Sequence, residues 1–455
     1  MAQTIAAIAT PAAPAGLGVI RISGDEAIAV AQRVFRPLNP AHTPDALPGY
    51  AAAYGHVFDR DGDVDDCVAL IFRAPHSYTG EDVAELSCHG GVYLLRRALR
   101  ACFAAGARPA APGEFTRRAF MNGKMDLAQA ESVMDLISAD GRLAARTALA
   151  AREGALAHRL EGVRRDLLAA AAQMGAYVDY PDEDIPELRP EALAATVAAA
   201  REAITGLLDT FDAGRILREG IDTAIVGAPN VGKSTLMNRL TGTERSIVTA
   251  VAGTTRDVVE ETVRLGDVTL RLADTAGIRQ TGDPVEKVGV DRARGRMEQA
   301  ALVLLVLDGS RPLTAEEREL ALRASQKAAV AVINKADQPL LTDRAWIGEQ
   351  FRYTVDLSAK DGTAVETLAA AVAQITGVER LNGDEPVLAT ERQRAAAERC
   401  REALDEAAAA LEQGMTLDAV GVSLDAALSA LGALTGERVT EAVVDEVFAR
   451  FCVGK

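Results

Sequence analysis

Cysteine is scarce in this sequence, and its spacing gives no disulfide or metal-binding pattern. The 455 residues include five cysteines, none of them in a C-x-x-C pair: Cys67, Cys88, Cys102, Cys400 and Cys452. Cys88 precedes His89, but no second pair of ligands stands at the spacing of a zinc site. No secretory signal precedes them, so we expect reduced thiols and a cytoplasmic location.

Long apolar runs and a basic excess are also missing. The strongest apolar run, residues 300–307, is typical of a buried strand and falls far short of the roughly 18 residues that cross a bilayer, so no membrane association is expected. Asp and Glu number 65 against 49 Lys and Arg, which gives a net charge of −16. Overall charge therefore does not attract nucleic acid, and any RNA contact requires a local basic patch or a partner.

Composition and periodicity predict three domains. Residues 1–120 mix short apolar runs with many Pro and Gly turns, which indicates an α+β domain. The alanine-rich stretches 121–213 and 377–455 have helical spacing, and we expect them to form one all-α domain, with two independent helical arms as the alternative. An α/β domain with a mainly parallel sheet, residues 214–376, is predicted to be inserted between them. Its predicted strands are 223–226, 268–273, 302–307, 329–333 and 353–357.

A phosphate-binding loop follows the first of these strands. Residues 227–234 read Gly-Ala-Pro-Asn-Val-Gly-Lys-Ser and match the pattern Gly-x-x-x-x-Gly-Lys-Ser. Glycines let main-chain N–H groups surround the phosphates, and the helix that follows directs its positive end at the same anion. Lys233 is expected at the β- and γ-phosphates, and the Ser234 hydroxyl on Mg²⁺.

Two further motifs predict the parts that respond to the γ-phosphate. Thr255, within Gly-Thr-Thr-Arg-Asp, is expected to complete the Mg²⁺ shell only when the γ-phosphate is present. Asp274 begins Asp-Thr-Ala-Gly and would hold Mg²⁺ through water, while the N–H of Gly277 would contact the γ-phosphate.

A motif for guanine recognition follows the fourth predicted strand. The Asp337 carboxylate, in Asn-Lys-Ala-Asp, can accept two hydrogen bonds from the guanine edge that adenine does not offer. Asn334 and Lys335 would flank the base, and Ser-Ala-Lys at 358–360 lies where a second base-contacting loop belongs. The chain is predicted to bind and hydrolyse GTP through Asn230, Val231, Gly232, Lys233, Ser234, Thr235, Thr249, Thr254, Thr255, Asp274, Thr275, Ala276, Gly277, Asn334, Lys335, Asp337, Ser358, Ala359 and Lys360.

The glutamine that many small GTPases place after Asp-x-x-Gly is absent. Ile278 occupies that position and cannot orient the attacking water. Glu286 is the nearest carboxylate on the expected switch helix, and Asp283 is the competing candidate. A solvated charge on the helix face is an equally acceptable interpretation of Glu286 from the sequence alone.

Several other segments carry a resemblance to a known family. They are Arg21-Ile-Ser-Gly24, Thr79-Gly-Glu-Asp82, His89-Gly-Gly91, Asn122-Gly-Lys-Met-Asp-Leu127 and the final Cys452-Val-Gly-Lys455. Together with the GTP motifs they resemble the MnmE (TrmE) family of tRNA-modification GTPases, over essentially the full chain.

The resemblance implies a folate-binding, dimerising N-terminal domain, a helical domain interrupted by the GTPase domain, and GTP hydrolysis stimulated by K⁺. By position, it assigns K⁺ coordination to Asn230, Thr249, Val251 and Thr254. It assigns catalysis to Glu286 and a role in tRNA modification to Cys452. It places contacts to a tetrahydrofolate derivative, 5-formyl- or methylene-tetrahydrofolate, at Arg21, Glu81, Lys124 and Lys455.

The resemblance also implies a function and partners. A homodimer would work with a flavoprotein of the MnmG (GidA) kind, which alone carries FAD, in a heterotetramer-like complex. The pair would install an aminomethyl-type or carboxymethylaminomethyl-type group at C5 of the wobble uridine of certain tRNAs. A ribosome-assembly GTPase, or a regulatory GTPase without modification chemistry, is the alternative. The sequence contains neither a second Gly-Lys-Ser loop nor a basic G-x-x-G module, which argues against the ribosome-assembly alternative.

Overall fold

The computed structural model describes residues 3–179, 189–243, 261–272, 295, 297–437 and 439–455. By its contacts the chain divides into two compact units, Met1–Met134 with Thr435–Lys455, and Asp135–Leu434. The first and last parts of the sequence therefore fold together. The domain boundaries drawn from the sequence stay predictions.

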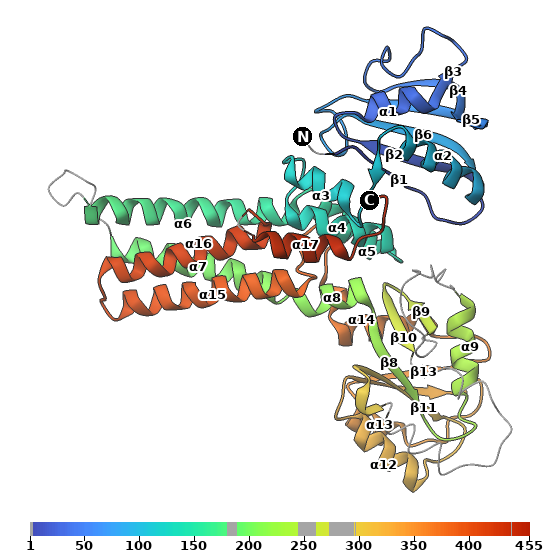
Figure 1. The fold of residues 1–455 in the computed structure, drawn as a ribbon. Coiled ribbons are helices and arrows are strands. Elements are labelled where there is room, and N and C mark those ends of the chain that lie inside the picture. The colour runs from blue at the N-terminus through green and yellow to red at the C-terminus, as the bar shows by residue number, and fades with distance from the viewer. Residues whose placement is uncertain (1–2, 180–188, 244–260, 273–294, 296, 438) are drawn as a thin grey trace. The chain divides into compact units, whose positions relative to one another are not determined.

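The first unit is built on a seven-stranded sheet with the order β3-β4-β5-β6-β2-β1-β7 (Figure 1). Neighbouring strands are antiparallel, except that β7 runs parallel to β1. The strands are β1 (Ile5–Ile8), β2 (Ala15–Ser23), β3 (Phe35–Pro37), β4 (Ala51–Asp59), β5 (Gly62–Phe72), β6 (Val83–Gly90) and β7 (Arg108–Pro109).

The alternation of β2 divides its side chains between two environments. Ile20 and Ile22 are fully buried and share a core with residues of α1 (Ala27–Val34) and α2 (Val92–Ala104). Because successive side chains of a strand point to opposite faces, Arg21 and Ser23 lie on the other face of the sheet. That face holds the polar residues considered below.

Short helices and the end of the chain lie on this second face of the sheet. They are α3 (Glu114–Met121), α4 (Leu127–Ser138, whose last residues belong to the second unit) and α17 (Glu441–Ala449). A core that includes Leu127, Phe448 and Phe451 joins α4, α17 and the final segment. That segment also runs beside the start of α3, where the N–H groups of Gly113 and Phe115 donate to main-chain oxygens of Cys452 and Lys455, at 3.3 and 3.2 Å.

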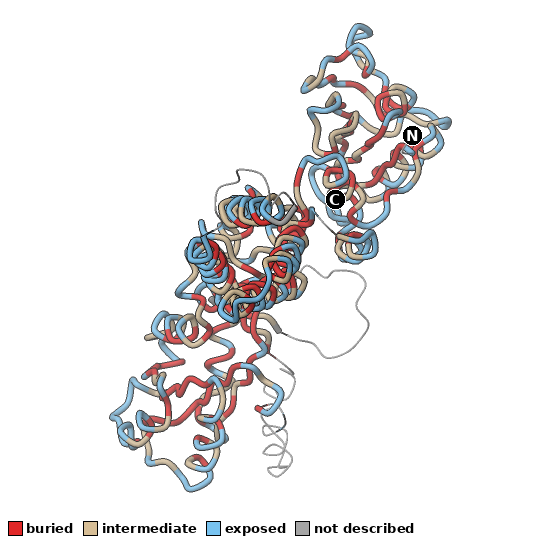
Figure 2. The backbone as a smooth tube through the Cα atoms, turned by 90° about the vertical axis from the view of Figure 1, so that its left-hand side faces the viewer, coloured by how far each residue is buried: buried red, intermediate tan, exposed pale blue. Residues whose placement is uncertain are grey.

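The helical part of the second unit brings together segments from both sides of the α/β region. Its helices are α5 (Arg142–Arg152), α6 (Ala155–Asp179), α7 (Pro190–Leu208), α8 (Phe211–Glu219), α15 (Glu391–Glu412) and α16 (Leu417–Thr435). Helix α7 packs along α15, and Arg201 pairs with Asp405 across them at 2.5 Å. In Figure 2 the buried residues lie on the inner sides of these helices.

Helix α16 bears on the expectation that no stretch of the sequence is long and apolar enough to cross a membrane. An 18-residue stretch of this 19-residue helix has a mean hydropathy of 1.5, so among the described residues it is long and apolar enough to cross a membrane by length and composition alone. However, 44% of that stretch is buried, including Val420, Leu424 and Leu431. A core helix of a packed bundle passes the same test, and the alanine and leucine content of α16 accounts for the value.

The α/β region is a six-stranded sheet with the order β13-β12-β11-β8-β10-β9. All strand pairs are parallel except β9–β10. Separate cores on its two faces hold the covering helices. The elements are β8 (Ile221–Val226), α9 (Lys233–Thr243), β9 (Glu261–Leu265), β10 (Val268–Leu272), β11 (Leu302–Asp308), α12 (Ala315–Ala324), β12 (Ala329–Asn334), α13 (Arg344–Gln350), β13 (Tyr353–Leu357), α14 (Val365–Thr376) and the 3₁₀ helix η1 (Val378–Arg380). The predicted fold class, α+β, all-α and inserted α/β parts in one chain, is confirmed.

The packing of α8 generates a prediction about stability. Gly214 is buried where α8 meets residues 387–388, and a β-carbon there would overlap the Leu388 carbonyl oxygen and the Val387 side chain. Gly214→Ala is therefore expected to lower the free energy of unfolding of the second unit by about 1–3 kcal/mol, because backbone must move to make room. Thermal unfolding followed by circular dichroism measures the change.

Gly206 provides a matched control. It lies in the neighbouring helix α7, and a β-carbon there meets no atom within 4 Å. Gly206→Ala should leave stability unchanged or raise it by up to about 1 kcal/mol, because alanine favours the helix. Equal effects of the two substitutions would contradict the assigned packing of Gly214.

Candidate functional site

The phosphate loop lies between the end of β8 and the start of α9, at the carboxyl edge of the parallel sheet. Gly227 has φ 155° and Gly232 has φ 100°. A side chain on Gly227 would overlap the Val306 carbonyl oxygen, and one on Gly232 would overlap the Asn334 amide. The loop therefore requires glycine at both positions, and its close packing leaves the main chain as the surface that meets a phosphate.

Lys233 begins α9 and turns back onto this loop. Its ammonium donates to the carbonyl oxygens of Gly227 and Ala228 at 2.8 and 2.6 Å. Burial lowers the pKa of Lys233 from its ordinary value, because a charged ammonium loses water there. The two carbonyl contacts hold this cation beside the loop, where phosphate oxygens would bind.

Asn334, at the end of β12, connects the phosphate loop with the second predicted base loop. Its Nδ2 donates to the Val231 carbonyl at 2.8 Å, and its Oδ1 accepts from the Ala359 N–H at 2.9 Å. The side chain is buried, so both halves of the amide have a partner. One side chain thus fixes the spacing between the loop predicted to bind phosphate and the loop predicted to bind the base.

Asp337 and Ser358 lie together beyond this amide. The Ser358 hydroxyl is 3.1 Å from Asp337 Oδ1 and 3.2 Å from Asp361 Oδ2. Asp337 itself is exposed. Its carboxylate is oriented by Ser358 and remains accessible to a purine edge that presents two donors.

Lys335 is held by a carboxylate on the neighbouring strand. It adopts φ 65°, and its ammonium lies 2.6 Å from Asp308 Oδ2. Burial alone would raise the pKa of Asp308, but hydrogen bonds from Lys335 and Ser310 outweigh it and hold that pKa below the usual range. The ion pair therefore keeps the Lys335 side chain in a defined position near the base loop.

The sequence did not identify Arg239 as part of the site. From α9, its Nη2 donates to the Lys360 carbonyl at 2.5 Å, and its Nε lies 3.5 Å from the Ala359 carbonyl. Asp308 and Asp361 were also missed. These residues belong to no nucleotide motif, and only the folded chain places them against the predicted loops.

The structure groups twelve of the predicted nucleotide residues around β8, β12 and β13. Val231 is buried, Ser234 and Thr235 lie in the first turn of α9, and Asn230 has φ 63°. The remaining predicted nucleotide, cation and catalytic residues of this region lie outside the described residues: Thr249, Val251, Thr254, Thr255, Asp274, Thr275, Ala276, Gly277 and Glu286.

A second cluster lies in the first unit, around Arg21 of β2. Arg21 Nε pairs with Glu85 Oε1 at 2.8 Å, its partner across β2 and β6. Its guanidinium carbon also lies 5.5 and 5.7 Å from the ring centres of Tyr78 and Phe115. Arg21 is therefore held by charge and by aromatic contact together. Among these residues the sequence singled out Arg21 alone.

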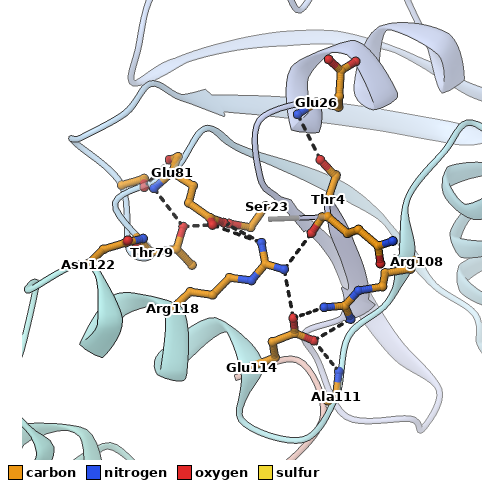
Figure 3. A network of polar contacts seen from close by, with 12 residues as sticks. Thr4, Ser23, Glu26, Thr79, Glu81, Arg108, Ala111, Glu114, Arg118 and Asn122 are labelled. Atoms are coloured by element: carbon orange, nitrogen blue, oxygen red, sulfur yellow. Dashed lines mark hydrogen bonds and ion pairs between the residues drawn. The ribbon is translucent and has the colours of Figure 1, made fainter. Parts of the chain in front are cut away.

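Glu81 lies beside Ser23, which follows Arg21 by two residues on the same face of β2. The Ser23 hydroxyl donates to Glu81 Oε2 at 2.7 Å, and Arg118 of α3 contacts both carboxylate oxygens (Figure 3). Lys124 follows α3, and its ammonium donates to the Pro75 carbonyl at 3.0 Å, in the loop that also carries Glu81.

The chain end joins this cluster. Burial first, and the nearby Arg21 guanidinium second, lower the pKa of Lys455, while Glu85 and Cys452 act in the opposite direction. Cys452 is exposed, whereas the other four cysteines are buried. Burial raises the pKa of Cys102 and Cys400 to about 12, so those thiols resist ionisation. The predicted folate residues and Cys452 thus come from distant parts of the sequence into the first unit.

The arrangement of the second unit defines a class of protein. A glycine-dependent phosphate loop after β8, a lysine at its end and an Asn-Lys-x-Asp reader after β12 are the features of a P-loop GTPase. Here that domain stands between helical segments that pack with one another, in a chain with a further α+β part.

Comparison with known proteins identifies the family. Residues 4–124 match the family model "GTP-binding protein TrmE N-terminus", and residues 127–452 match "MnmE helical domain". The protein called tRNA modification GTPase MnmE in Symbiobacterium thermophilum is 43% identical over 100% of this chain and 99% of its own length. Its namesake in Chloroflexus aurantiacus is 41% identical over 100% of both, and that of a Nostoc species is 40% identical over 99% of both. The chain belongs to the MnmE (TrmE) family of tRNA-modification GTPases.

Base recognition can be tested at Asp337. An Asp337→Asn substitution replaces an acceptor pair by one donor and one acceptor, which fits the edge of xanthine and not that of guanine. We expect at least tenfold weaker binding of GDP and a gain in affinity for xanthosine diphosphate, measured by titration calorimetry. An unchanged preference for guanine would show that Asp337 does not contact the base.

Proposed function

We propose that this GTPase couples GTP hydrolysis to modification of C5 of the wobble uridine in certain tRNAs, together with a flavoprotein of the MnmG (GidA) kind. The observation that carries the proposal is the presence of two separate clusters in one chain of this family. One is a guanine-nucleotide site, and the other joins Arg21 and Glu81 to Lys455 and an exposed Cys452.

In the nucleotide cluster, the chain's own residues supply positioning and charge. Lys233 neutralises the β- and γ-phosphates, and the loop N–H groups bind their oxygens. The Ser234 hydroxyl at the start of α9 is a suitable hard ligand for Mg²⁺, with Thr255 as its proposed companion. The amide oxygen of Asn230 is likewise a suitable hard ligand for K⁺. A cation at that place would offset charge that develops between the β- and γ-phosphates.

Water activation is assigned to Glu286. Thr249, Val251 and Thr254 would complete the coordination of K⁺ that Asn230 begins. This assignment follows the family pattern, since Ile278 cannot orient water. Hydrolysis would drive pairing and separation of the GTPase domains in a homodimer. It would serve as a switch while the one-carbon chemistry takes place elsewhere.

The first-unit cluster is assigned to the folate derivative. Arg21, Lys124 and Lys455 provide cations for a ligand that carries a glutamate tail, and Glu81 provides acceptors for the edge of its pterin ring. The Cys452 thiol is exposed, as a reacting group must be. The chain carries a net charge of −16, so we assign much of the basic surface for tRNA to the flavoprotein.

Wobble-uridine chemistry in cells tests this function. Mass spectrometry of tRNA nucleosides is expected to show loss of the C5 modification in cells that carry either Cys452→Ser or Asp337→Asn in place of the natural chain. The purified Cys452→Ser protein should hydrolyse GTP at the natural rate. Normal modification in both strains would refute the proposed role and favour a GTPase without modification chemistry.

Cation dependence tests the nucleotide assignment separately. The GTPase rate is expected to be at least several-fold higher in K⁺ than in Na⁺ at equal ionic strength, because K⁺ would bind at Asn230. An Asn230→Gly variant removes the amide oxygen but accepts the φ of 63° at this position, so it should lose the difference between the two salts. Equal rates for the natural chain in K⁺ and Na⁺ would remove the K⁺ site.

A further inference from the structure

Arg118 on α3 makes an unusually complete set of contacts for an arginine. Its Nη1 contacts both oxygens of Glu81 at 3.1 and 2.9 Å, and its Nη2 donates to the Gln3 carbonyl at 2.7 Å and to Glu114 Oε1 at 2.9 Å (Figure 3). Its side chain is only 10% exposed. One guanidinium thus joins the loop that carries Glu81, the start of the chain and its own helix.

The Glu81 carboxylate is also constrained from the opposite direction. The Ser23 hydroxyl lies 2.7 Å from Glu81 Oε2 and 2.7 Å from the Thr79 hydroxyl, and Thr79 Oγ1 accepts the Glu81 N–H at 3.3 Å. The loop itself is attached to the end of α3, because Asn122 Nδ2 donates to the Thr79 carbonyl at 2.7 Å. The carboxylate therefore has one orientation before any ligand arrives.

Arg118 is in turn kept in place by Glu114, the first residue of α3. Burial would favour the neutral acid, but Arg108, the Ala111 N–H and Arg118 outweigh it and lower the pKa of Glu114 to about 2. Glu114 consequently stays ionised throughout the neutral range, and the fork of Arg118 remains fixed between two carboxylates.

Glu81 retains capacity for a ligand within this network. An ionised carboxylate has about four lone-pair directions. Ser23 and Arg118 take both directions on Oε2, and Arg118 takes one on Oε1, so one direction on Oε1 remains for a ligand. One acceptor oxygen in a fixed direction fits an N–H of a ring edge that carries an amino group, and fixing this acceptor in advance reduces the entropy lost on binding.

We propose that Arg118 is a positioning residue that holds the Glu81 carboxylate for the amino-pyrimidine edge of a reduced folate; this rests on the folate role proposed above for Glu81. Arg118 itself does not contact the ligand. Its contribution is to preset the direction of the carboxylate and of the acceptor that remains on Oε1.

The test measures binding of 5-formyl-tetrahydrofolate to the full chain by titration calorimetry. Arg118→Gln is expected to weaken binding at least tenfold, and Arg118→Lys at least threefold, because a lysine cannot contact both oxygens of Glu81 and Glu114 together. Arg117→Gln is the matched control. Arg117 is the neighbouring residue of the same helix, and its ion pairs are with Glu441 and Asp445 instead of Glu81. Arg117→Gln should change affinity by less than twofold.

A double-mutant cycle separates positioning from a general loss of structure. If Arg118 acts through Glu81, adding Arg118→Gln to Glu81→Gln should weaken binding by less than a further twofold. Effects that multiply fully would overturn the inference. Circular dichroism verifies that each variant is folded. If Arg118→Gln does not fold, Arg118→Lys replaces it in the cycle, and natural affinity in that variant overturns the inference.

The natural chain distinguishes this inference from the function on which it rests. Absence of 5-formyl-tetrahydrofolate binding by the natural chain would remove the folate role and the inference together. Binding by the natural chain that is unchanged in a folded Arg118→Gln variant would overturn the positioning role alone and leave the folate role intact.

Discussion

The buried amide of Asn334 sets the geometry on which the nucleotide site depends. Its two ends hold the Val231 carbonyl and the Ala359 N–H, so the phosphate loop and the base loop keep a fixed separation. Gly232 has to lack a side chain because this amide occupies the space beside it. Lys335 and Asp337 lie within three residues of Asn334, and each is oriented by a neighbour, Asp308 or Ser358. The loops predicted to bind the base and the phosphates are thus held together by one buried side chain.

Helix α3 has a comparable part in the first unit. Its first turn binds main-chain oxygens of Cys452 and Lys455, its Phe115 ring lies beside Arg21, and its Arg118 holds Glu81. Residues separated by more than 300 positions in the sequence therefore depend on one short helix. The N–H groups at the start of a helix are free to bind oxygens of another segment, which explains why the final residues settle there.

Sequence patterns predicted the α/β strands to within two residues at each end, because buried parallel strands give short apolar runs between turns. Strand β9 was missed, since Glu261–Leu265 is short and alternates polar with apolar residues. Motif spacing predicted the phosphate and base loops. It could not predict Arg118 or Glu85, whose partners lie 37 and 64 positions away and are joined only by strand register and helix placement. Helix α16 was not recognised as strongly apolar because Asp418 and Asp425 interrupt it.

The place where the chain enters and leaves the α/β region bears on whether that region can be separated from the helical segments. Ala213 and Gly377, at its entry and exit, are neighbours: a β-carbon on Gly377 would lie 3.8 Å from that of Ala213. The Thr210 hydroxyl also accepts the Leu388 N–H at 3.1 Å just beyond this point. The chain thus enters and leaves the nucleotide-binding region through two adjacent segments, although Leu143 of α5 also packs against the core of that region and Arg264 donates to the Asp140 carbonyl at 2.7 Å. A short glycine linker could replace the α/β region and connect the two helical segments that remain. The excised region would have its two ends side by side, which suits insertion into another protein.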